Sequence, residues 1–251
     1  MIAERDTMGG LAKGLLVIES FSAERPRQSI AQVAAATGLD RATARRCLLT
    51  LAREGYAEWD GKFFTLTPRV LRLGTACLAT LPLPVIIQPF LDRLSEEIGE
   101  STSVSILDGG DIVYLARAAQ RKVMSISLMP GSRLPAYCTS MGRVLLAARE
   151  EGEVRGLLEG APLPVRTVKT KTDPEAILGE IRMVREQGFA LIDQEVEIGL
   201  QSLAVPVLNA RGRTVAALNV GVAGQGDPDE IRARFLHHLL RVQGQLRLQL
   251  H

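Results

Sequence analysis

The start of the chain alternates between helical hydrophobic patterns and short polar breaks. Between residues 10 and 21 (GLAKGLLVIESF), apolar side chains recur every three or four positions, which predicts an amphipathic helix. The stretch SAERPRQ interrupts that pattern, and residues 29–55 then read as two further helices joined by a short turn. The order of one helix, a break and two helices indicates a small helical unit at the start of the chain.

Capping residues mark the ends of the helix pair. Ser29 precedes the first helix and Gly38 follows it, and these residue types commonly begin and end helices. Asp40 is placed to cap the second helix, which runs to about Glu54 and stops at Gly55. Two helices around a glycine-centred turn predict a helix–turn–helix.

The second helix of the pair separates apolar from basic residues. Its apolar stripe, at spacing i, i+3, i+4 and i+7, consists of Ala44, Cys47, Leu48 and Leu51. No acid interrupts residues 41–53, so the opposite face is basic. Alone, such a face is typical of a solvated helix, whereas in a helix–turn–helix it enters the major groove of DNA. An arginine fork matches guanine O6 and N7 or a phosphate, so the candidate DNA contacts are Arg41, Thr43, Arg45 and Arg46.

A hairpin signal follows the helix pair. Two apolar-rich segments in YAEWDGKFFTLT flank Asp60-Gly61, a common two-residue hairpin turn. Lys62 lies at the predicted tip, where it can meet a DNA phosphate. Helix, helix–turn–helix and hairpin in this order predict a winged helix-turn-helix domain over residues 10–67, after a disordered N-terminus at 1–9. The agreement of these features favours double-stranded DNA as a partner over a merely solvated helix.

A connector of different character comes next. Residues 68–82 predict a linker helix that ends at the LPLP break, and a second amphipathic helix runs from about Pro84 to Ile98. The linker is more apolar than a solvated helix requires, at Leu71, Leu73, Leu78 and Leu81. It either packs on its own domain or pairs with a second subunit, as a DNA-binding dimer needs.

Residues 83–251 have a mixed α/β pattern. A hairpin is predicted at 101–119 with its turn at Asp108-Gly-Gly, and PGSRLPAY is predicted to be a loop. Further strands are predicted at SISLM (125–129), FALIDQE (189–195), LQSLAVPVLN (200–209) and TVAALNVGV (214–222), with helices at about 140–148, 150–159, 173–187 and 227–250. Antiparallel strands covered by helices predict an α+β domain of sensory size.

The stretch AYCTSMGRVLLA (136–147) sets Cys138, Thr139 and Ser140 at a predicted helix start. A helix N-terminus offers unpaired N–H groups and partial positive charge, so it binds carboxylates or phosphates. Gly142 would let a ligand approach the backbone, while Arg133 and Arg143 are nearby cations and Tyr137 can stack on an aromatic ring. The alternative is a simple helix cap flanked by solvated arginines.

A row of acids adds a second candidate. Asp193, Glu195 and Glu197 alternate in IDQEVE, so on a strand they would share one face. There they can accept hydrogen bonds from ligand hydroxyls, or form a solvated face, a bridge to arginines or a weak metal site. No metal or cofactor is predicted.

Composition and motifs exclude several classes of protein. The 251 residues carry a net charge of only +2, but residues 1–75 hold 11 basic against 8 acidic residues, so the basic excess is local. No apolar run reaches the length of a membrane span, and three scattered cysteines fit a reducing cytoplasm. The only histidines are His237, His238 and His251, and no hydrolase or metalloprotease motif occurs, so catalysis is not expected.

From about Gly10 onward the chain resembles the IclR family of bacterial transcription regulators. The resemblance lies in LAKGLLVIESF, the helix–turn–helix IAQVAAATGLDRATARRCLLTLAREGY, GSRLPAYCTSMGRVLLA, IDQEVEIGLQSLAVPV and VAALNVGV. LPAYCTSMGRVLLA is similar in particular to the branch that regulates catabolism of protocatechuate, 4-hydroxybenzoate or related acids. The family implies a winged helix, a dimerising linker helix and a GAF-like effector domain, with dimers that often pair into tetramers.

The resemblance also implies where an effector binds. Family pockets use the positions that match residues 133–142, Asp193, Ser202, Asn219 and Gly221; the last two depart from the usual Cys or Ser. A small aromatic carboxylate would place its carboxylate on the helix start or an arginine. Its ring would lie against Leu134, Tyr137 and Met141, and its hydroxyls toward Asp193 and Asn219. The full set of expected ligand contacts is Arg133, Leu134, Tyr137, Thr139, Ser140, Met141, Gly142, Asp193, Glu195, Ser202, Asn219 and Gly221.

The sequence therefore predicts a transcription regulator that binds an inverted-repeat operator under control of a small aromatic acid. One alternative is an architectural DNA-binding protein whose C-terminal domain only oligomerises. Another is a regulator of the same family that responds to a non-aromatic carboxylate.

Overall fold

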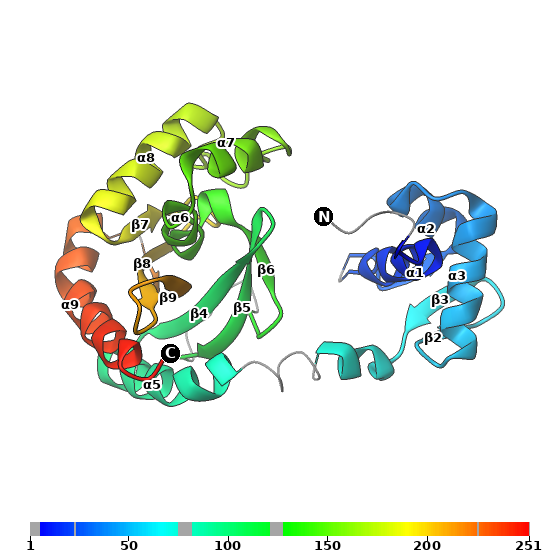
Figure 1. The fold of residues 1–251 in the computed structure, drawn as a ribbon, viewed down its shortest axis with the longest axis horizontal. Coiled ribbons are helices and arrows are strands. Elements are labelled where there is room, and N and C mark those ends of the chain that lie inside the picture. The colour runs from blue at the N-terminus through cyan, green and yellow to red at the C-terminus, as the bar shows by residue number, and fades with distance from the viewer. Residues whose placement is uncertain (1–5, 23, 75–81, 121–127, 225, 251) are drawn as a thin grey trace. The chain divides into compact units, whose positions relative to one another are not determined.

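The computed structural model describes residues 6–22, 24–74, 82–120, 128–224 and 226–250. The chain divides into two compact units, Met1–Thr80 and Leu81–His251 (Figure 1). The first unit is largely helical with a small sheet, and the second is a larger α+β unit. Each unit has its own hydrophobic core, so each is described separately.

The first unit contains the predicted helix–turn–helix. Its helices are α1 (Gly9–Glu19), α2 (Ile30–Thr37) and α3 (Arg41–Arg53). The predicted caps are confirmed: Ser29 forms a capping box with Gln32, Gly38 ends α2 in the left-handed conformation (φ +71°), and Asp40 accepts a hydrogen bond from the Thr43 N–H at 2.8 Å. The α1 helix begins inside the segment 1–9 that was expected to be disordered, of which residues 1–5 lie outside the described residues.

The predicted wing is also present. Strands β2 (Ala57–Trp59) and β3 (Phe63–Leu66) pair antiparallel across the Asp60-Gly61 turn. The Asp60 carboxylate accepts hydrogen bonds from the N–H groups of Lys62 and Phe63, and Gly61 supplies the positive φ (+101°) that the turn requires. The sequence pattern missed β1 (Arg27–Ser29), which pairs with β3 and completes a three-stranded sheet of order β1-β3-β2.

The connector is described only in part. A 3-10 helix, η2 (Pro68–Val70), follows the wing, and residues 71–74 continue as helix. The rest of the predicted linker helix, including Leu78 and Leu81, lies outside the described residues. Helix α5 (Pro82–Ile98) then begins two residues earlier than predicted.

The second unit is built on a six-stranded antiparallel sheet of order β6-β5-β4-β9-β8-β7. Two helices, α5 and α9 (Pro228–Arg247), cover one face, and the other face carries α6 (Ser140–Ala147), α7 (Glu151–Glu159) and α8 (Pro174–Gln187) (Figure 1). The strands are β4 (Ser101–Asp108), β5 (Asp111–Ala118), β6 (Arg133–Pro135), β7 (Ala190–Asp193), β8 (Leu200–Leu208) and β9 (Thr214–Ala223). Apolar side chains on both faces form two cores, which fixes the strand register.

Two predictions for this unit were wrong. The segment expected to be a loop before α6 contains β6, because Leu134 turns into the core and its neighbours pair with β5. The strand expected over 189–195 ends at Asp193, because Gln194 has φ +61° and leaves the extended conformation. The predicted SISLM strand lies mostly outside the described residues. None of the described helices is long and apolar enough to cross a membrane.

Candidate DNA interface and effector cavity

The exposed face of α3 carries the basic residues. Packing of Ala44 and Leu48 into the core of the first unit turns Arg41, Arg45 and Arg46 toward solvent. Arg46 donates one hydrogen bond to the Thr43 hydroxyl (3.3 Å), which leaves most of its guanidinium donors available. The arrangement presents a row of arginines on one helix, as a recognition helix requires.

Thr43 does not belong to that exposed face. Its side chain is only 7% exposed, its hydroxyl accepts from Arg46, and its N–H is capped by Asp40. The prediction that Thr43 contacts DNA directly therefore conflicts with its burial. Thr43 instead steadies the arginine one helical turn later, through the i, i+3 spacing that brings helix side chains together.

The wing presents a second cationic point. Lys62 lies exposed at the tip, with its ammonium 5.2 Å from the Phe63 ring centroid. Arg27 of the neighbouring strand β1 lies over the same ring, with its guanidinium carbon 4.3 Å from the Phe63 centroid, and pairs with Asp60. Hydrogen bonds from Phe63 N–H, Arg27 and Lys62 N–H keep the pKa of Asp60 below its ordinary value, so the tip stays fixed.

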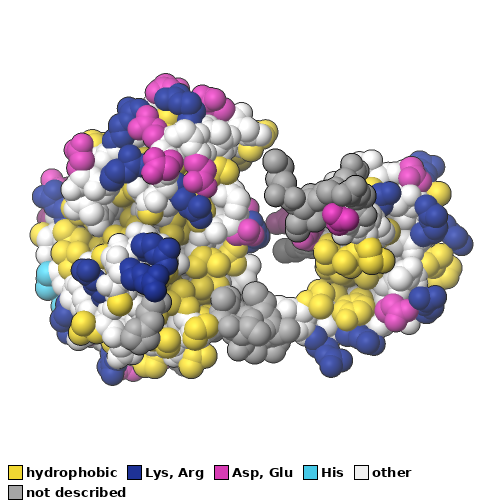
Figure 2. All heavy atoms as spheres, viewed as in Figure 1, with side chains coloured by type: hydrophobic (Ala, Val, Ile, Leu, Met, Phe, Trp, Pro, Cys, Tyr) yellow, Lys and Arg dark blue, Asp and Glu magenta, His cyan; other side chains and the backbone are white. Residues whose placement is uncertain are grey.

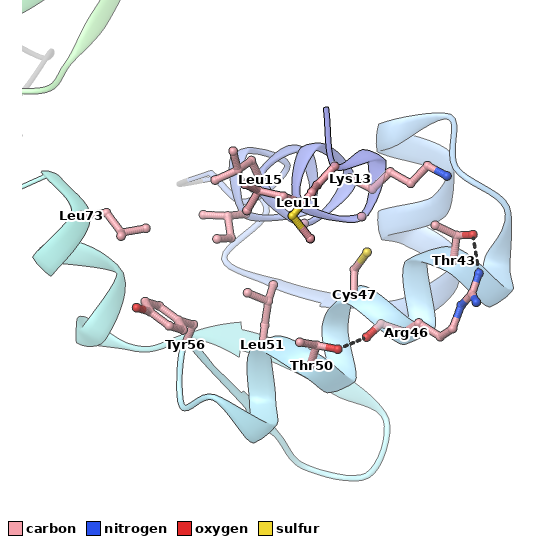
Figure 3. A pocket seen from close by; sticks show the side chains of 14 residues that line it. Leu11, Lys13, Leu15, Thr43, Arg46, Cys47, Thr50, Leu51, Tyr56 and Leu73 are labelled. Carbon is pink, nitrogen blue, oxygen red and sulfur yellow. Dashed lines mark hydrogen bonds between the residues drawn. The ribbon is translucent and has the colours of Figure 1, made fainter. Parts of the chain in front are cut away.

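An apolar groove of about 660 Å³ opens between α1 and α3 in the same unit (Figure 3). Leu11, Leu15 and Lys13 of α1 border it opposite Cys47 and Leu51 of α3, and Tyr56 and Leu73 extend it. Figure 2 shows hydrophobic side chains gathered on one part of this unit's surface, with Lys and Arg side chains along its outer edge. Exposed apolar area of this kind marks an interaction surface.

The second unit encloses a small cavity of about 30 Å³ between the start of α6 and the central strands. Seven of the predicted ligand residues line it: Leu134, Thr139, Ser140, Met141, Ser202, Asn219 and Gly221. Sequence reasoning missed the other six lining residues, which are Ser101, Tyr114, Arg117, Leu128, Val196 and Leu200. The lining combines apolar walls with a few converging polar groups, as ligand sites do.

The start of α6 brings hydroxyls to the cavity. Thr139 is the N-cap and its Oγ1 accepts from the Gly142 N–H (3.1 Å), while Ser140 Oγ accepts from Ser202 Oγ (2.8 Å). Gly142 does not provide a ligand approach, because a Cβ there would lie 2.1 Å from the Ala136 carbonyl oxygen. Its hydrogen side chain instead lets the helix pack on the preceding turn.

Arg117 and Asn219 give the cavity its polarity. Arg117 of β5 and Asn219 of β9 are both paired with Ser103 of β4, so the two side chains share one face of the sheet. Arg117 donates to Ser103 Oγ (3.0 Å) and has no carboxylate partner among the described residues; burial lowers its pKa. Asn219 is 8% exposed, and its Oδ1 accepts no hydrogen bond. Among the described residues, the cavity therefore holds a half-buried cation without a carboxylate and a buried acceptor without a donor.

Arg133 and Tyr137 do not line the cavity. The Arg133 guanidinium bonds Asp108 and Asp111 at the β4–β5 turn, because its strand lies at the sheet edge beside that hairpin. The Tyr137 hydroxyl donates to the Pro164 carbonyl, and the buried ring packs in the core instead of lining the cavity. Their predicted roles as carboxylate clamp and stacking ring conflict with these contacts.

Asp193 and Glu195 also point elsewhere. Asp193 pairs with Lys169 and accepts hydrogen bonds from Gln194 and Gln201 (both 2.9 Å). Burial opposes the lowering of its pKa, but these hydrogen bonds outweigh it. Glu195 binds Arg143, and the positive φ of Gln194 interrupts the extended backbone on which the two acids would share a face. The shared acidic face predicted from their alternation does not form.

Among the described residues, Arg143 is the largest fully buried side chain, at 1% exposure. Its guanidinium donates to Tyr137 O (3.0 Å) and Glu195 Oε2 (2.9 Å) and pairs with Glu180, which in turn pairs with Lys171. It is therefore neither solvated nor open to a ligand. Burial raises the pKa of the adjacent Cys138 thiol to about 11, so the Cys-Thr-Ser row holds no activated nucleophile.

Comparison with known families accounts for most of the chain. Residues 10–61 match the IclR helix-turn-helix domain, and residues 75–243 match the family described as bacterial transcriptional regulator IclR C-terminal. The chain belongs to the IclR family of bacterial transcription regulators. It is a DNA-binding regulator and not an enzyme.

Individual relatives agree with this assignment. The chain is 45% identical to the Pca regulon regulatory protein of Pseudomonas putida over 98% of this chain and 85% of that protein. It is 39% identical to the p-hydroxybenzoate hydroxylase transcriptional activator of Acinetobacter baylyi over 87% and 82% of the two chains. Among solved structures, the inducer-binding domain of a PobR double mutant from Acinetobacter, in complex with 3-hydroxybenzoic acid, superposes with a TM-score of 0.60 at 32% identity, covering 65% of this chain and 97% of that one.

Proposed function

We propose that this regulator binds a hydroxylated aromatic acid in the cavity of its second unit and alters transcription of aromatic catabolic genes in response. Relatives that regulate pca genes and p-hydroxybenzoate hydroxylase, and a related domain that holds 3-hydroxybenzoic acid, support this effector class. Protocatechuate and 4-hydroxybenzoate are the first candidates. The action on DNA implies a cytoplasmic protein.

The observation that carries the proposal is the unpartnered pair in the cavity. Among the described residues, Arg117 supplies a half-buried cation without a carboxylate, and Asn219 supplies a buried acceptor without a donor. They stand two strand spacings apart, about 10 Å, on one face of the sheet. An aromatic acid would pair its carboxylate with Arg117 and donate from a hydroxyl at the other end of the ring to Asn219. Ser140 and Ser202 offer further hydrogen bonds.

A thermal-shift screen of the full chain tests the effector class. Protocatechuate and the hydroxybenzoates are expected to raise the melting temperature, because a ligand that binds only the folded state stabilises it. Catechol, which lacks the carboxylate, and muconate, which lacks the ring, serve as controls. A shift with muconate alone would favour a non-aromatic carboxylate. No shift with any acid would favour an architectural DNA-binding protein.

Asn219→Leu is expected to weaken binding of 4-hydroxybenzoate about tenfold and leave benzoate within about twofold. Leucine branches at Cγ as asparagine does but cannot accept a hydrogen bond from the ring hydroxyl, and one buried hydrogen bond is worth roughly a factor of ten. Isothermal titration calorimetry with both acids measures the difference. Equal losses for both acids would place the hydroxyl elsewhere.

We also propose that two copies bind an inverted-repeat operator as a dimer. Arg41, Arg45 and Arg46 of each α3 would enter successive major grooves, with Lys62 on a phosphate. The groove between α1 and α3, bordered by Leu11 and Leu15, would pack against the second subunit (Figure 3).

Leu15→Glu is expected to weaken operator binding at least tenfold, because a charge in an apolar subunit contact is costly to bury. The matched control is Leu240→Glu on α9, since Leu15 and Leu240 are both 45% exposed. Gel-shift titration combined with analytical ultracentrifugation gives affinity and assembly together. Operator affinity like that of the wild type would show that the groove is not a subunit contact.

A further inference from the structure

The effector cavity is too small for its proposed occupant in this conformation. Its volume is about 30 Å³, the share of one water molecule in the liquid, whereas a cavity that holds benzene measures roughly 150 Å³. One wall is formed by Val196, which lies in the loop of residues 194–199 between β7 and β8, here called the β7–β8 loop. Entry of an aromatic acid therefore requires a wall to move.

Buried polar contacts hold the β7–β8 loop in place. The Arg143 guanidinium of α6 binds Glu195 in the middle of the loop and the Tyr137 carbonyl before the helix. Two threonine hydroxyls form hydrogen bonds with the loop backbone: Thr167 donates to Gln194 O and Thr170 donates to Glu195 O, both at 2.7 Å. The contact from Arg143 is the one that ties the loop to the helix whose first residues line the cavity.

We propose that Arg143 and Glu195 are positioning residues for effector binding, which close the β7–β8 loop over the cavity and part when an effector enters. The inference rests on the proposed function, because it takes the cavity as the effector site. Neither residue touches the cavity; both act through Val196, which stands next to Glu195 in the loop. The relatives and family assignment above give no role to this ion pair.

Opening the loop changes the surroundings of Glu195 from buried to solvated. Closed, Glu195 is 4% exposed, and its Oε2 also accepts from the Lys171 N–H (3.2 Å). The groups that face this carboxyl or its loop are Tyr137, Cys138, Arg143, Arg166, Lys171 and Asp193. Burial raises the pKa of Glu195 to about 7, although Arg143 opposes the rise, while a solvated glutamate has its ordinary pKa of 4.5.

The sign of the pH effect follows from this difference. The closed loop binds a proton at Glu195 more tightly than the open loop does, so protonation favours closure. Raising the pH through 7 ionises the buried carboxyl and makes opening easier. Burial places the pKa values of Tyr137 and Cys138 at about 12 and 11, and that of Asp193 lies below its ordinary value, so none of the three titrates near 7.

The test is the association rate of 4-hydroxybenzoate on the full chain, measured by surface plasmon resonance between pH 6 and pH 8. The carboxyl group of the probe stays ionised over this range. The wild-type rate is expected to rise about tenfold from pH 6 to pH 8. Glu195→Gln mimics the protonated side chain, so its rate should stay flat and lie roughly 300-fold below the wild-type rate at pH 8, the factor that pKa values of about 7 and 4.5 imply.

Two further variants complete the design. Glu151→Gln alters an exposed carboxyl paired with Arg182 on α8, and it should keep the tenfold rise. The double variant Arg143→Met/Glu195→Leu removes both buried charges, while Glu180 keeps its partner Lys171, so this variant avoids an unpaired buried charge and should also be flat.

Hydrogen–deuterium exchange of residues 194–199 at pH 8 measures how often the β7–β8 loop opens in the absence of effector. Exchange should be slower in Glu195→Gln than in the wild type, because the closed loop protects its amides. Any one of three results would overturn the inference. The association rate of the wild type does not change with pH, the rate of Glu195→Gln still rises with pH, or residues 194–199 exchange equally fast in both proteins. Each of these would leave the proposed function standing if binding still depends on Asn219. Binding that ignores Asn219 would instead overturn the proposed function.

Discussion

Replacing Arg117 by methionine is expected to weaken binding of 4-hydroxybenzoate at least about 100-fold, a loss of about 2.7 kcal/mol. Arg117 is the cation in the cavity that has no carboxylate partner in the described part of the chain, so an anionic effector supplies its missing charge. Methionine keeps an unbranched apolar stem and loses the charge. Because the substitution removes a half-buried cation that has no carboxylate partner among the described residues, the fold should melt at the same temperature or higher without effector.

Arg133→Met is the matched control for this experiment. Arg133 is half-exposed and already paired with Asp108 and Asp111, and exposed pairs of this kind contribute little to stability. Effector affinity should stay within about twofold of the wild type. Calorimetry on both variants shows which arginine binds the carboxylate of the effector. Loss of binding in Arg133→Met alone would place the carboxylate near β6.

Alanine at both Arg45 and Arg46 is expected to weaken binding to the operator about 1000-fold and to random DNA only about tenfold. Each arginine fork on a guanine contributes roughly 1–3 kcal/mol of discrimination, whereas phosphate contacts act on any sequence. Fluorescence anisotropy at two salt concentrations, with a DNA site selected by the wild-type protein and a scrambled site, gives both losses.

Arg53→Ala serves as the control on the same helix. Arg53 lies in its last turn and pairs with Glu54, so the change should leave operator affinity within about twofold. Equal losses on operator and scrambled DNA in the Arg45/Arg46 variant would mean that these arginines bind only the DNA backbone.

Local signals predicted the first unit well because each acts within a few residues. Caps at Ser29 and Asp40, the left-handed Gly38 and the Asp60-Gly61 turn depend on neighbouring backbone alone, and all are confirmed. The short β1 strand was missed because its pairing with β3 spans more than thirty residues. Thr43 was wrongly predicted to be exposed. Helical spacing shows that it lies beside the apolar stripe of α3, but it does not show that the core of the first unit also covers it.

The residues alone predicted the α6 side of the effector cavity, and the family resemblance added Ser202, Asn219 and Gly221 on the strands. The hydroxyls of Thr139 and Ser140 follow from their place at a helix start, which the sequence displays. Nothing in the local sequence YLARAA distinguishes Arg117 from other residues of a strand. Its role depends on the pairing of β5 and β9 with β4, which places Arg117 and Asn219 on the same face of the sheet. An arginine between alanines, opposite a strand with Ser101, Ser103 and Ser105 on one face, is a signal to seek in other chains.

The tight packing at Gly142 has a consequence for redesign of this protein as a biosensor. No larger side chain fits there, since the Ala136 carbonyl occupies the space, so the α6 wall cannot be varied without disturbing its helix. The strand β9 offers the opposite situation: a Cβ at Gly221 would meet only Leu200, at 4.0 Å. Libraries that retune which inducer is detected should therefore vary Asn219 and Gly221 and keep Gly142 unchanged.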